Sequence, residues 1–155
     1  MVICDVATGT SLRWLKGHAP RKVTGLAFSP DGHRLASCSD DTTVALWEVS
    51  TGQAIETLRG HASNVNDVRF SPDGKLVASG GFDETLRIWD PASSQEPWSL
   101  RLPTGVTSVV YSPDGKTLVA GDGYETAVWN ASTGEQQWNQ PEALTAYVKI
   151  GRAHV

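Results

Sequence analysis

The sequence predicts an all-β fold built from repeated groups of short strands. The same turn sequence occurs three times, as FSPDG at 28–32 and 70–74 and as YSPDG at 111–115. The chain of 155 residues also contains 15 Gly, 8 Pro and 6 Trp, a composition that favours turns and pleated strands over long helices. A polar turn that returns at nearly equal intervals indicates one structural unit copied along the chain.

Two further markers keep the same interval. Trp47, Trp89 and Trp129 lie 42 and 40 residues apart, and Gly17-His18 recurs as Gly60-His61 after 43 residues. A period of about 40 to 45 residues, with Gly-His before a run of short strands and Trp near its end, is typical of propeller blades. Three markers with one period therefore predict blades of a β-propeller.

Each copy is expected to supply four short antiparallel strands. In the first full copy the strand-like runs are 23–28, 34–39, 43–49 and 54–58. The turn at 29–32, SPDG, is a tight reversal, because Pro presets φ at its second position and Gly accepts the left-handed conformation. SPDG therefore shapes a hairpin and carries no chemistry.

The chain resembles the WD40 repeat proteins from about Val2 to Trp138. The resemblance rests on GHAPRKVTGLAFSPDGHRLASCSDDTTVALWEVSTGQ and GHASNVNDVRFSPDGKLVASGGFDETLRIWD, and on a weaker third copy that ends in TAVWN. It implies a partial WD40 β-propeller with radially stacked, four-stranded antiparallel blades. Residues 17–59 and 60–101 are expected to form blades, and 102–140 a degenerate blade.

Both ends of the chain depart from whole blades. The stretch VICDVATGTSLRWLKGH aligns without gaps on ALWEVSTGQAIETLRGH, so residues 2–16 are expected to be the second half of a blade. Residues 141–148 are a possible start of the next blade. Residues 149–155, KIGRAHV, resemble the translation of a sequencing adapter and are expected to be a non-native tail. The chain is therefore expected to be an excerpt of about half a closed ring.

Two sets of polar residues each contain a Ser, a His and an Asp and could suggest a hydrolase. Their repetition argues against catalysis, because a nucleophile needs one exposed site, and neither LASCS nor VASGG has the G-x-S-x-G pattern. In the family that the chain resembles, these residues and the Trp of the third strand form a structural hydrogen-bond tetrad. The resemblance places two tetrads here, His18, Ser37, Asp41 and Trp47, and His61, Ser79, Asp83 and Trp89. No catalytic residue is expected.

The third copy departs from this pattern. It keeps Trp129, but the run 102–105, LPTG, stands where Gly-His is expected, and Gly121 is assigned to the Ser position. Pro103 cannot replace an imidazole, so this blade is expected to be the least stiff and to depend on apolar packing.

The resemblance also implies that the chain binds other proteins or peptides. In the family, the residue before the first strand and the residue before the tetrad Asp face the binding surface. The corresponding residues here are Lys22, Asp40, Asn64 and Phe82, with Tyr124 in a roughly equivalent place. Phe82 is the sharpest candidate, and its ring is expected either to anchor a partner or to plug a loop.

Composition argues against several other classes of function. The net charge is −4, with 13 basic and 17 acidic residues interspersed, so no basic stripe is present for nucleic acid. Cys4 and Cys38 stand alone without metal-site spacing, and no metal or cofactor is expected. The sequence has no apolar run long enough for a membrane span and no signal segment at its start, so a cytoplasmic location is expected.

The predicted function is a non-catalytic protein-interaction scaffold, as a WD40 segment of a larger protein. Two alternatives stay open. The chain could be an accessory propeller of a larger signalling enzyme such as a kinase, or a truncated reading without independent function. A homodimer in which two copies close one ring is a further, less favoured arrangement.

Overall fold

The structure, a computed structural model, describes residues 1–93, 98–122 and 125–140, and over these residues it consists of β-strands joined by turns. The strands form three four-stranded sheets and one two-stranded sheet, all antiparallel, and in each sheet sequence neighbours pair. The first sheet contains β3 (Val23–Phe28), β4 (Arg34–Ser39), β5 (Thr43–Glu48) and β6 (Ala54–Arg59). The second contains β7 (Val65–Phe70), β8 (Val77–Gly81), β9 (Thr85–Trp89) and β10 (Trp98–Arg101). The third contains β11 (Ser108–Tyr111), β12 (Thr117–Gly121), β13 (Thr126–Asn130) and β14 (Gln136–Gln140), and the small sheet contains β1 (Val2–Cys4) and β2 (Ser11–Trp14).

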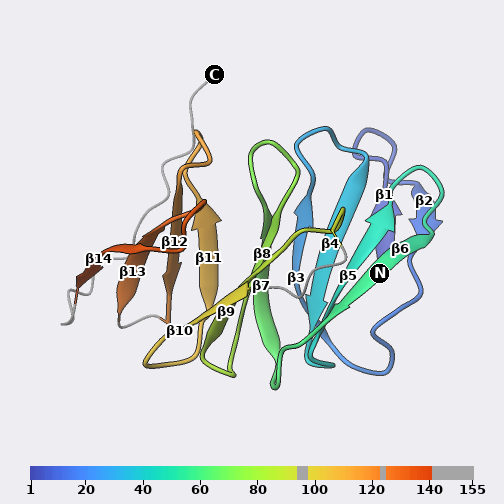
Figure 1. The fold of residues 1–155 in the computed structure, drawn as a ribbon. Coiled ribbons are helices and arrows are strands. Elements are labelled where there is room, and N and C mark those ends of the chain that lie inside the picture. The colour runs from blue at the N-terminus through green and yellow to red at the C-terminus, as the bar shows by residue number, and fades with distance from the viewer. Residues whose placement is uncertain (94–97, 123–124, 141–155) are drawn as a thin grey trace.

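The three larger sheets stand beside one another in a fan, with the β1–β2 hairpin at the right end of the row in Figure 1. We call them the first, second and third blades. The predicted all-β fold of stacked four-stranded blades is confirmed. Among the described residues, no helix has the length and apolar character that crossing a membrane requires. The stretches 141–148 and 149–155 lie outside the described residues.

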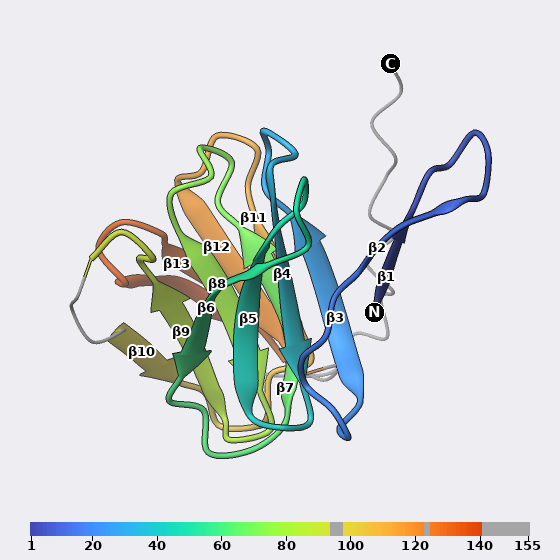
Figure 2. The ribbon, with the colours of Figure 1, turned by 90° about the vertical axis from the view of Figure 1, so that its right-hand side faces the viewer.

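The three SPDG turns fold into the same hydrogen-bonded hairpin. In the first turn, the Gly32 N–H donates to the Ser29 carbonyl over 2.9 Å, and Gly32 has a φ of 74°, in the left-handed region. The Ser29 hydroxyl donates to Asp31 and also accepts a backbone N–H from the start of the next strand. The same side-chain contacts recur around Ser71 and Ser112. All three turns lie at the same end of the blades, uppermost in Figures 1 and 2.

The apolar core lies between the blades. One cluster joins Val44 and Leu46 of β5 to Val65 and Val68 of β7, and all four side chains are fully buried. A second cluster joins the second blade to the third, and a third cluster joins the β1–β2 hairpin to the first blade. Burying one Val or Leu side chain stabilises a fold by about 1.5–3 kcal/mol, so each blade depends on its neighbours for stability.

Hydrogen bonds also join each blade to the next along their first strands. The Thr24 hydroxyl donates to the Val65 carbonyl, and the Asn66 side chain donates to the Val106 carbonyl over 2.7 Å. These donors stand one residue after the first residue of β3 and of β7, so the same position makes the same contact in two copies. The blades are therefore joined by a repeated polar contact as well as by apolar packing.

One face of the first blade stays open. Leu26 and Phe28 on β3 are 50% and 57% exposed, whereas Val68 and Phe70, at the same positions of β7, are 0% and 8% exposed. Strand pairing fixes this equivalence, since Phe28 lies opposite Leu35 and Phe70 lies opposite Val77. The preceding blade covers the second pair, and only the short β1–β2 hairpin precedes the first.

Candidate functional site

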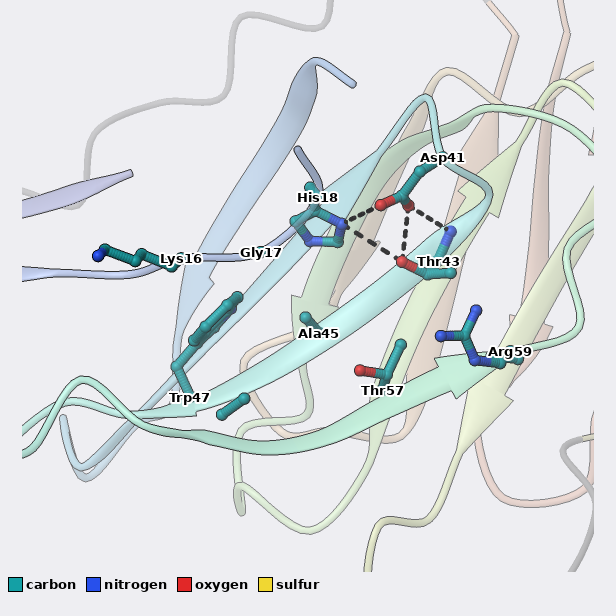
Figure 3. A pocket seen from close by; sticks show the side chains of 10 residues that line it. Lys16, Gly17, His18, Asp41, Thr43, Ala45, Trp47, Thr57 and Arg59 are labelled. Atoms are coloured by element: carbon teal, nitrogen blue, oxygen red, sulfur yellow. Dashed lines mark hydrogen bonds and ion pairs between the residues drawn. The ribbon is translucent and has the colours of Figure 1, made fainter. Parts of the chain in front are cut away.

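A buried chain of hydrogen bonds runs through the first blade. The Trp47 indole N–H donates to Ser37 Oγ over 2.8 Å, and Ser37 Oγ lies 2.8 Å from His18 Nε2. His18 Nδ1 lies 2.8 Å from Asp41 Oδ2, and Figure 3 shows the imidazole beside this carboxylate. Because an ionised carboxylate only accepts, Nδ1 carries the proton and Nε2 accepts the Ser37 hydroxyl. Each polar side chain of this first tetrad thus has a hydrogen-bond partner.

The second blade repeats this arrangement with different residues. The Trp89 indole N–H donates to Ser79 Oγ over 2.8 Å, and that oxygen lies 2.8 Å from His61 Nε2. His61 Nδ1 lies 2.9 Å from Asp83 Oδ2, which also accepts the Ala62 N–H over 2.8 Å. The structure therefore brings together all four residues of each predicted tetrad, and each set links the loop before the blade to its second and third strands.

Each tetrad is joined by a fifth residue, a threonine, that the sequence analysis did not single out. The Thr43 hydroxyl donates to Asp41 Oδ1 over 2.6 Å, and the Thr85 hydroxyl donates to Asp83 Oδ1 over 2.8 Å. Both threonines stand two residues after the tetrad Asp, at the first position of the third strand. This repeated placement was the signal that could have found them.

The glycine before the first tetrad histidine is required by the Trp ring. A Cβ placed on Gly17 would lie 2.5 Å from Cη2 of Trp47, closer than real Cβ contacts allow. The loop backbone of the first blade thus rests directly on the indole, whereas a Cβ placed on Gly60 would first meet Nη1 of Arg87, at 2.8 Å.

The second tetrad combines a neutral imidazole with an ionised carboxylate. Burial lowers the pKa of His61 below its ordinary value of 6.5, although attraction to Asp83 opposes this shift. Burial also raises the pKa of Asp83, but hydrogen bonds from the Ala62 N–H and from Thr85, with the attraction to His61, outweigh it. The pKa of Asp83 therefore lies below its ordinary value of 3.8. These directions agree with Nδ1 of His61 donating to Asp83.

The tetrads have the polarity of a Ser-His-Asp triad without its accessibility. Ser37 and Ser79 are fully buried, and each hydroxyl oxygen already accepts an indole N–H. A nucleophile must reach its substrate, so neither serine can act as one where it stands. Among the described residues, no group of three or more His, Cys, Asp or Glu side chains is placed to hold a metal ion.

The third blade differs from the expected alignment at one position. Ala120 lies opposite Ala127 as Ser37 lies opposite Ala45, so Ala120 occupies the Ser position and the assignment of Gly121 was wrong. Ala127 follows Ala120 by seven positions, whereas Ala45 follows Ser37 by eight, so the chain between the paired positions is one residue shorter in the third blade. Ala120 has no hydroxyl to link an indole to an imidazole.

The predicted partner-binding residues lie in pairs at one end of the blades. The Asp40 N–H donates to the Lys22 carbonyl over 3.0 Å, and the Phe82 N–H donates to the Asn64 carbonyl over 2.9 Å. This end is opposite the SPDG turns, because β3 and β7 begin there and β4 and β8 end there. Phe82 is 56% exposed. Tyr124 lies outside the described residues.

An open recess of about 250 Å³ lies beside the first tetrad (Figure 3). We call it the first-blade recess. It forms where the connection from β2 to β3 crosses the outer strands β5 and β6. Its lining includes Lys16, Asp41, Ala45, Trp47, Thr57 and Arg59.

Comparison with known protein families finds one family model that matches the chain in three segments. The family model for "WD domain, G-beta repeat" matches residues 9–48, 52–90 and 98–130. The chain belongs to the WD40 repeat family. Each of the first two matches begins before the last strand of one sheet and ends with the third strand of the next, so the repeat in sequence is offset from the blade in space. Proteins of this family are typically non-catalytic and bind protein partners.

Curated relatives match over short segments. Nuclear distribution protein PAC1-1 of Uncinocarpus reesii is 49% identical over 70 residues, covering 43% of this chain and 16% of that protein. The Lissencephaly-1 homolog of Caenorhabditis briggsae is 46% identical over 46 residues, 30% of this chain and 12% of that protein. Pre-mRNA-processing factor 19 of Mus musculus is 35% identical over 65 residues, 42% of this chain and 13% of that protein. The match thus covers less than a fifth of each of these relatives.

Proposed function

We propose that this WD40 chain is a non-catalytic scaffold that binds a protein or peptide at the end of the blades marked by Phe82. The observation that carries the proposal is the aromatic side chain of Phe82, which is 56% exposed. Its backbone is hydrogen-bonded to Asn64, and Asp40 and Lys22 form the equivalent pair in the first blade. Exposed aromatic residues on rigid supports are frequent energetic centres of protein interfaces. Family membership supports a protein partner.

The surroundings of Phe82 support an anchoring role. A Cβ placed on Gly105 would lie 3.1 Å from Cδ1 of Phe82, so one part of the ring rests against the backbone that leads into the third blade. The rest of the ring faces solvent. A side chain that is already held on one side loses little conformational freedom when a partner covers the other side.

The test compares two exposed apolar residues on different surfaces. We expect Phe82→Ala to remove at least one protein captured from the host extract by the wild-type chain. Ile55→Ala, on the outer strand β6 and 50% exposed in the wild type, should leave capture unchanged. Circular dichroism would verify that both variants are folded. If folded Phe82→Ala captures the same proteins in the same amounts, the Phe82 end is not the binding surface.

The exposed face of β3 supports the further proposal that the chain acts within a larger array of blades. Leu26 and Phe28 occupy positions that a preceding blade buries elsewhere in the same molecule. We expect a monomer by light scattering, with the face covered in the larger array by another blade. A dimer that Leu26→Ser dissociates would show instead that two copies cover this face for each other. A cytoplasmic location belongs to the same proposal, and imaging of the tagged native protein tests it.

A further inference from the structure

The outer corner of the second blade is filled by one of its own side chains. Arg87 lies opposite Ser79, and the carbon of its guanidinium is 6.0 Å from the centre of the Trp89 ring. Its Nε donates to the Thr85 hydroxyl over 3.3 Å. A Cβ placed on Gly60 would lie 2.8 Å from Nη1 of Arg87, so the guanidinium occupies the space beside the incoming loop.

The equivalent position in the other two blades is alanine, and both of these blades have a recess. Ala45 lies opposite Ser37, and Ala127 lies opposite Ala120. The first-blade recess measures about 250 Å³, and a third-blade recess of about 290 Å³ includes Ala127 and Trp129 in its lining. Arg87 therefore shows, within the same chain, which chemical group this corner accommodates.

The third-blade recess is lined by two acidic residues. Glu125 stands four residues before Trp129, as Thr85 stands four residues before Trp89, and it lines the recess together with Asp122. Arg101 also lines the recess, but its Nη2 lies 2.7 Å from Glu84 Oε2, which balances its charge. A cation placed as Arg87 is placed would meet the Glu125 carboxylate in place of a hydroxyl.

The first-blade recess has a similar volume, about 250 Å³, and a lining of opposite net charge. Its lining includes Lys16 and Arg59, and Thr42 stands where Glu84 stands in the second blade. The Asp41 carboxylate already accepts hydrogen bonds from His18 and Thr43. This recess therefore disfavours a cation and supplies an internal control.

We propose that the third-blade recess binds the guanidinium group of an arginine presented by a protein partner. The planar group lies over the Ala127 methyl beside Trp129 and donates to Glu125. Arginine is preferred to lysine because a planar, weakly hydrated fork both stacks on an indole and pairs with a carboxylate. Phe82 is not among the residues that line this recess. The proposal rests on the proposed function and deepens it by naming a chemical feature of the partner.

The experiment uses the full chain and isolated side-chain analogues, so it does not depend on knowing the partner. N-acetyl-arginine amide is titrated while the indole N–H resonance of Trp129 is followed by NMR. N-acetyl-lysine amide and N-acetyl-citrulline amide are titrated in parallel, since citrulline has the shape of arginine without its charge. We expect a saturable shift with the arginine analogue and at least about tenfold weaker binding of the other two, because a hydrogen bond between charged groups is the stronger kind.

Matched variants locate the binding. Ala127→Arg copies the residue of the second blade into the third and should abolish the shift, whereas Ala45→Arg fills the first-blade recess and should leave it unchanged. Glu125→Gln keeps the shape of the recess and should weaken binding about tenfold. Retained dispersion of the NMR spectrum verifies folding, and if Ala127→Arg does not fold, Glu125→Gln decides alone.

Three results would overturn the proposal. These are no saturable shift of the Trp129 resonance, equal binding of arginine and citrulline analogues, and binding that Glu125→Gln leaves unchanged. Loss of partner capture in Phe82→Ala, tested separately, has no bearing on these results, so failure of one proposal is distinguishable from failure of the other.

Discussion

At the residue scale, stability depends on polar groups that are buried only because each has a partner. His61 accepts from Ser79 on one side and donates to Asp83 on the other, at 2.8 and 2.9 Å. Removing the imidazole leaves a buried hydroxyl and a partly buried carboxylate without that contact. The folded state is therefore destabilised, because apolar packing cannot supply the hydrogen bonds that the hydroxyl and the carboxylate have lost.

The first prediction concerns His61→Ala. We expect the free energy of unfolding to fall by about 1–3 kcal/mol, the cost of leaving buried hydrogen-bonding groups unsatisfied. Urea unfolding followed by tryptophan fluorescence measures it. The matched control is His33→Ala, an exposed histidine next to the SPDG turn, which should change stability by less than about 0.5 kcal/mol. Equal losses in the two variants would remove the structural role assigned to the tetrad.

The second prediction concerns pH. The pKa of His61 in the folded chain lies below its ordinary 6.5, so the unfolded chain takes up this proton more readily. The contribution of the neutral imidazole is therefore fully present above about pH 6.5 and is lost as the pH falls below that value. We expect the free energy of unfolding to fall between pH 7.5 and pH 5.5, and to fall less in His61→Gln. Identical slopes for the two proteins would contradict this assignment.

The sequence placed the tetrads but not everything attached to them. Each tetrad residue lies at a fixed position in a repeated motif, so resemblance was sufficient to list it. Thr43 and Thr85 were missed because a threonine at the start of a strand is common for reasons of β-propensity alone. The assignment of Gly121 was one residue off. Ser37 and Ser79 each lie eight residues after the Ser of their SPDG turn, and the same count from Ser112 gives Ala120, as strand pairing confirms.

At the element scale, equivalent strands have different surroundings although their sequences are similar. The Phe at the end of β3 is 57% exposed and the Phe at the end of β7 is 8% exposed. Phe70 also lies under the guanidinium of Arg34, whose central carbon is 5.4 Å from the ring centre. The stability that a residue contributes is therefore set by the neighbouring blade rather than by the residue's own strand.

The third prediction follows from this difference. Phe70→Ala should lower the free energy of unfolding by about 3–5 kcal/mol, as expected for a buried aromatic residue. Phe28→Ala should lower it by less than about 1 kcal/mol, because more than half of that side chain already faces water. Parallel denaturant titrations of the two variants measure both values. Comparable losses would show that the face of β3 is covered in solution.

Strands and turns were the most predictable part of the fold. The SPDG turn fixes both ends of a hairpin, since Pro and Gly each restrict one backbone position, and the observed strands begin and end within one residue of the expected limits in the first copy. The open face of β3 could not be read from the strand itself, because LAF and VRF have nearly the same pattern of residues.

At the scale of the whole molecule, polar contacts join the blades in addition to the apolar clusters between them. Asp67 Oδ2 accepts the Val109 N–H over 3.0 Å across 42 residues of sequence. Burial raises the pKa of Asp67, although this hydrogen bond and the neighbouring Arg69 oppose the shift. The carboxylate therefore joins the second and third blades at the expense of its own solvation.

The fourth prediction separates the hydrogen bond of Asp67 from its charge. Asp67→Asn keeps an acceptor for the Val109 N–H and removes the buried charge, whereas Asp67→Ala removes both. We expect the Asn variant to be more stable than the Ala variant by about 1–3 kcal/mol, with faster amide exchange at Val109 in the Ala variant. Calorimetry and hydrogen exchange measure the two effects. Equal stabilities would mean that the contact contributes nothing to joining the blades.

The two recesses could not be predicted from the sequence, because residues of different repeats line each of them. Each one forms where a connection from the preceding blade crosses the outer strands, so its walls come from two repeats. Arg87, Ala45 and Ala127 belong to no motif in the sequence, and their equivalence becomes meaningful only once strand pairing aligns them.

Thr24 and Asn66 each donate a hydrogen bond to a backbone carbonyl of the following blade. A donor that recognises a main-chain oxygen is indifferent to which amino acid carries it. Whole repeats can therefore be duplicated, deleted or exchanged between genes without losing this bond, and side chains elsewhere on a blade are free to diverge toward new ligands.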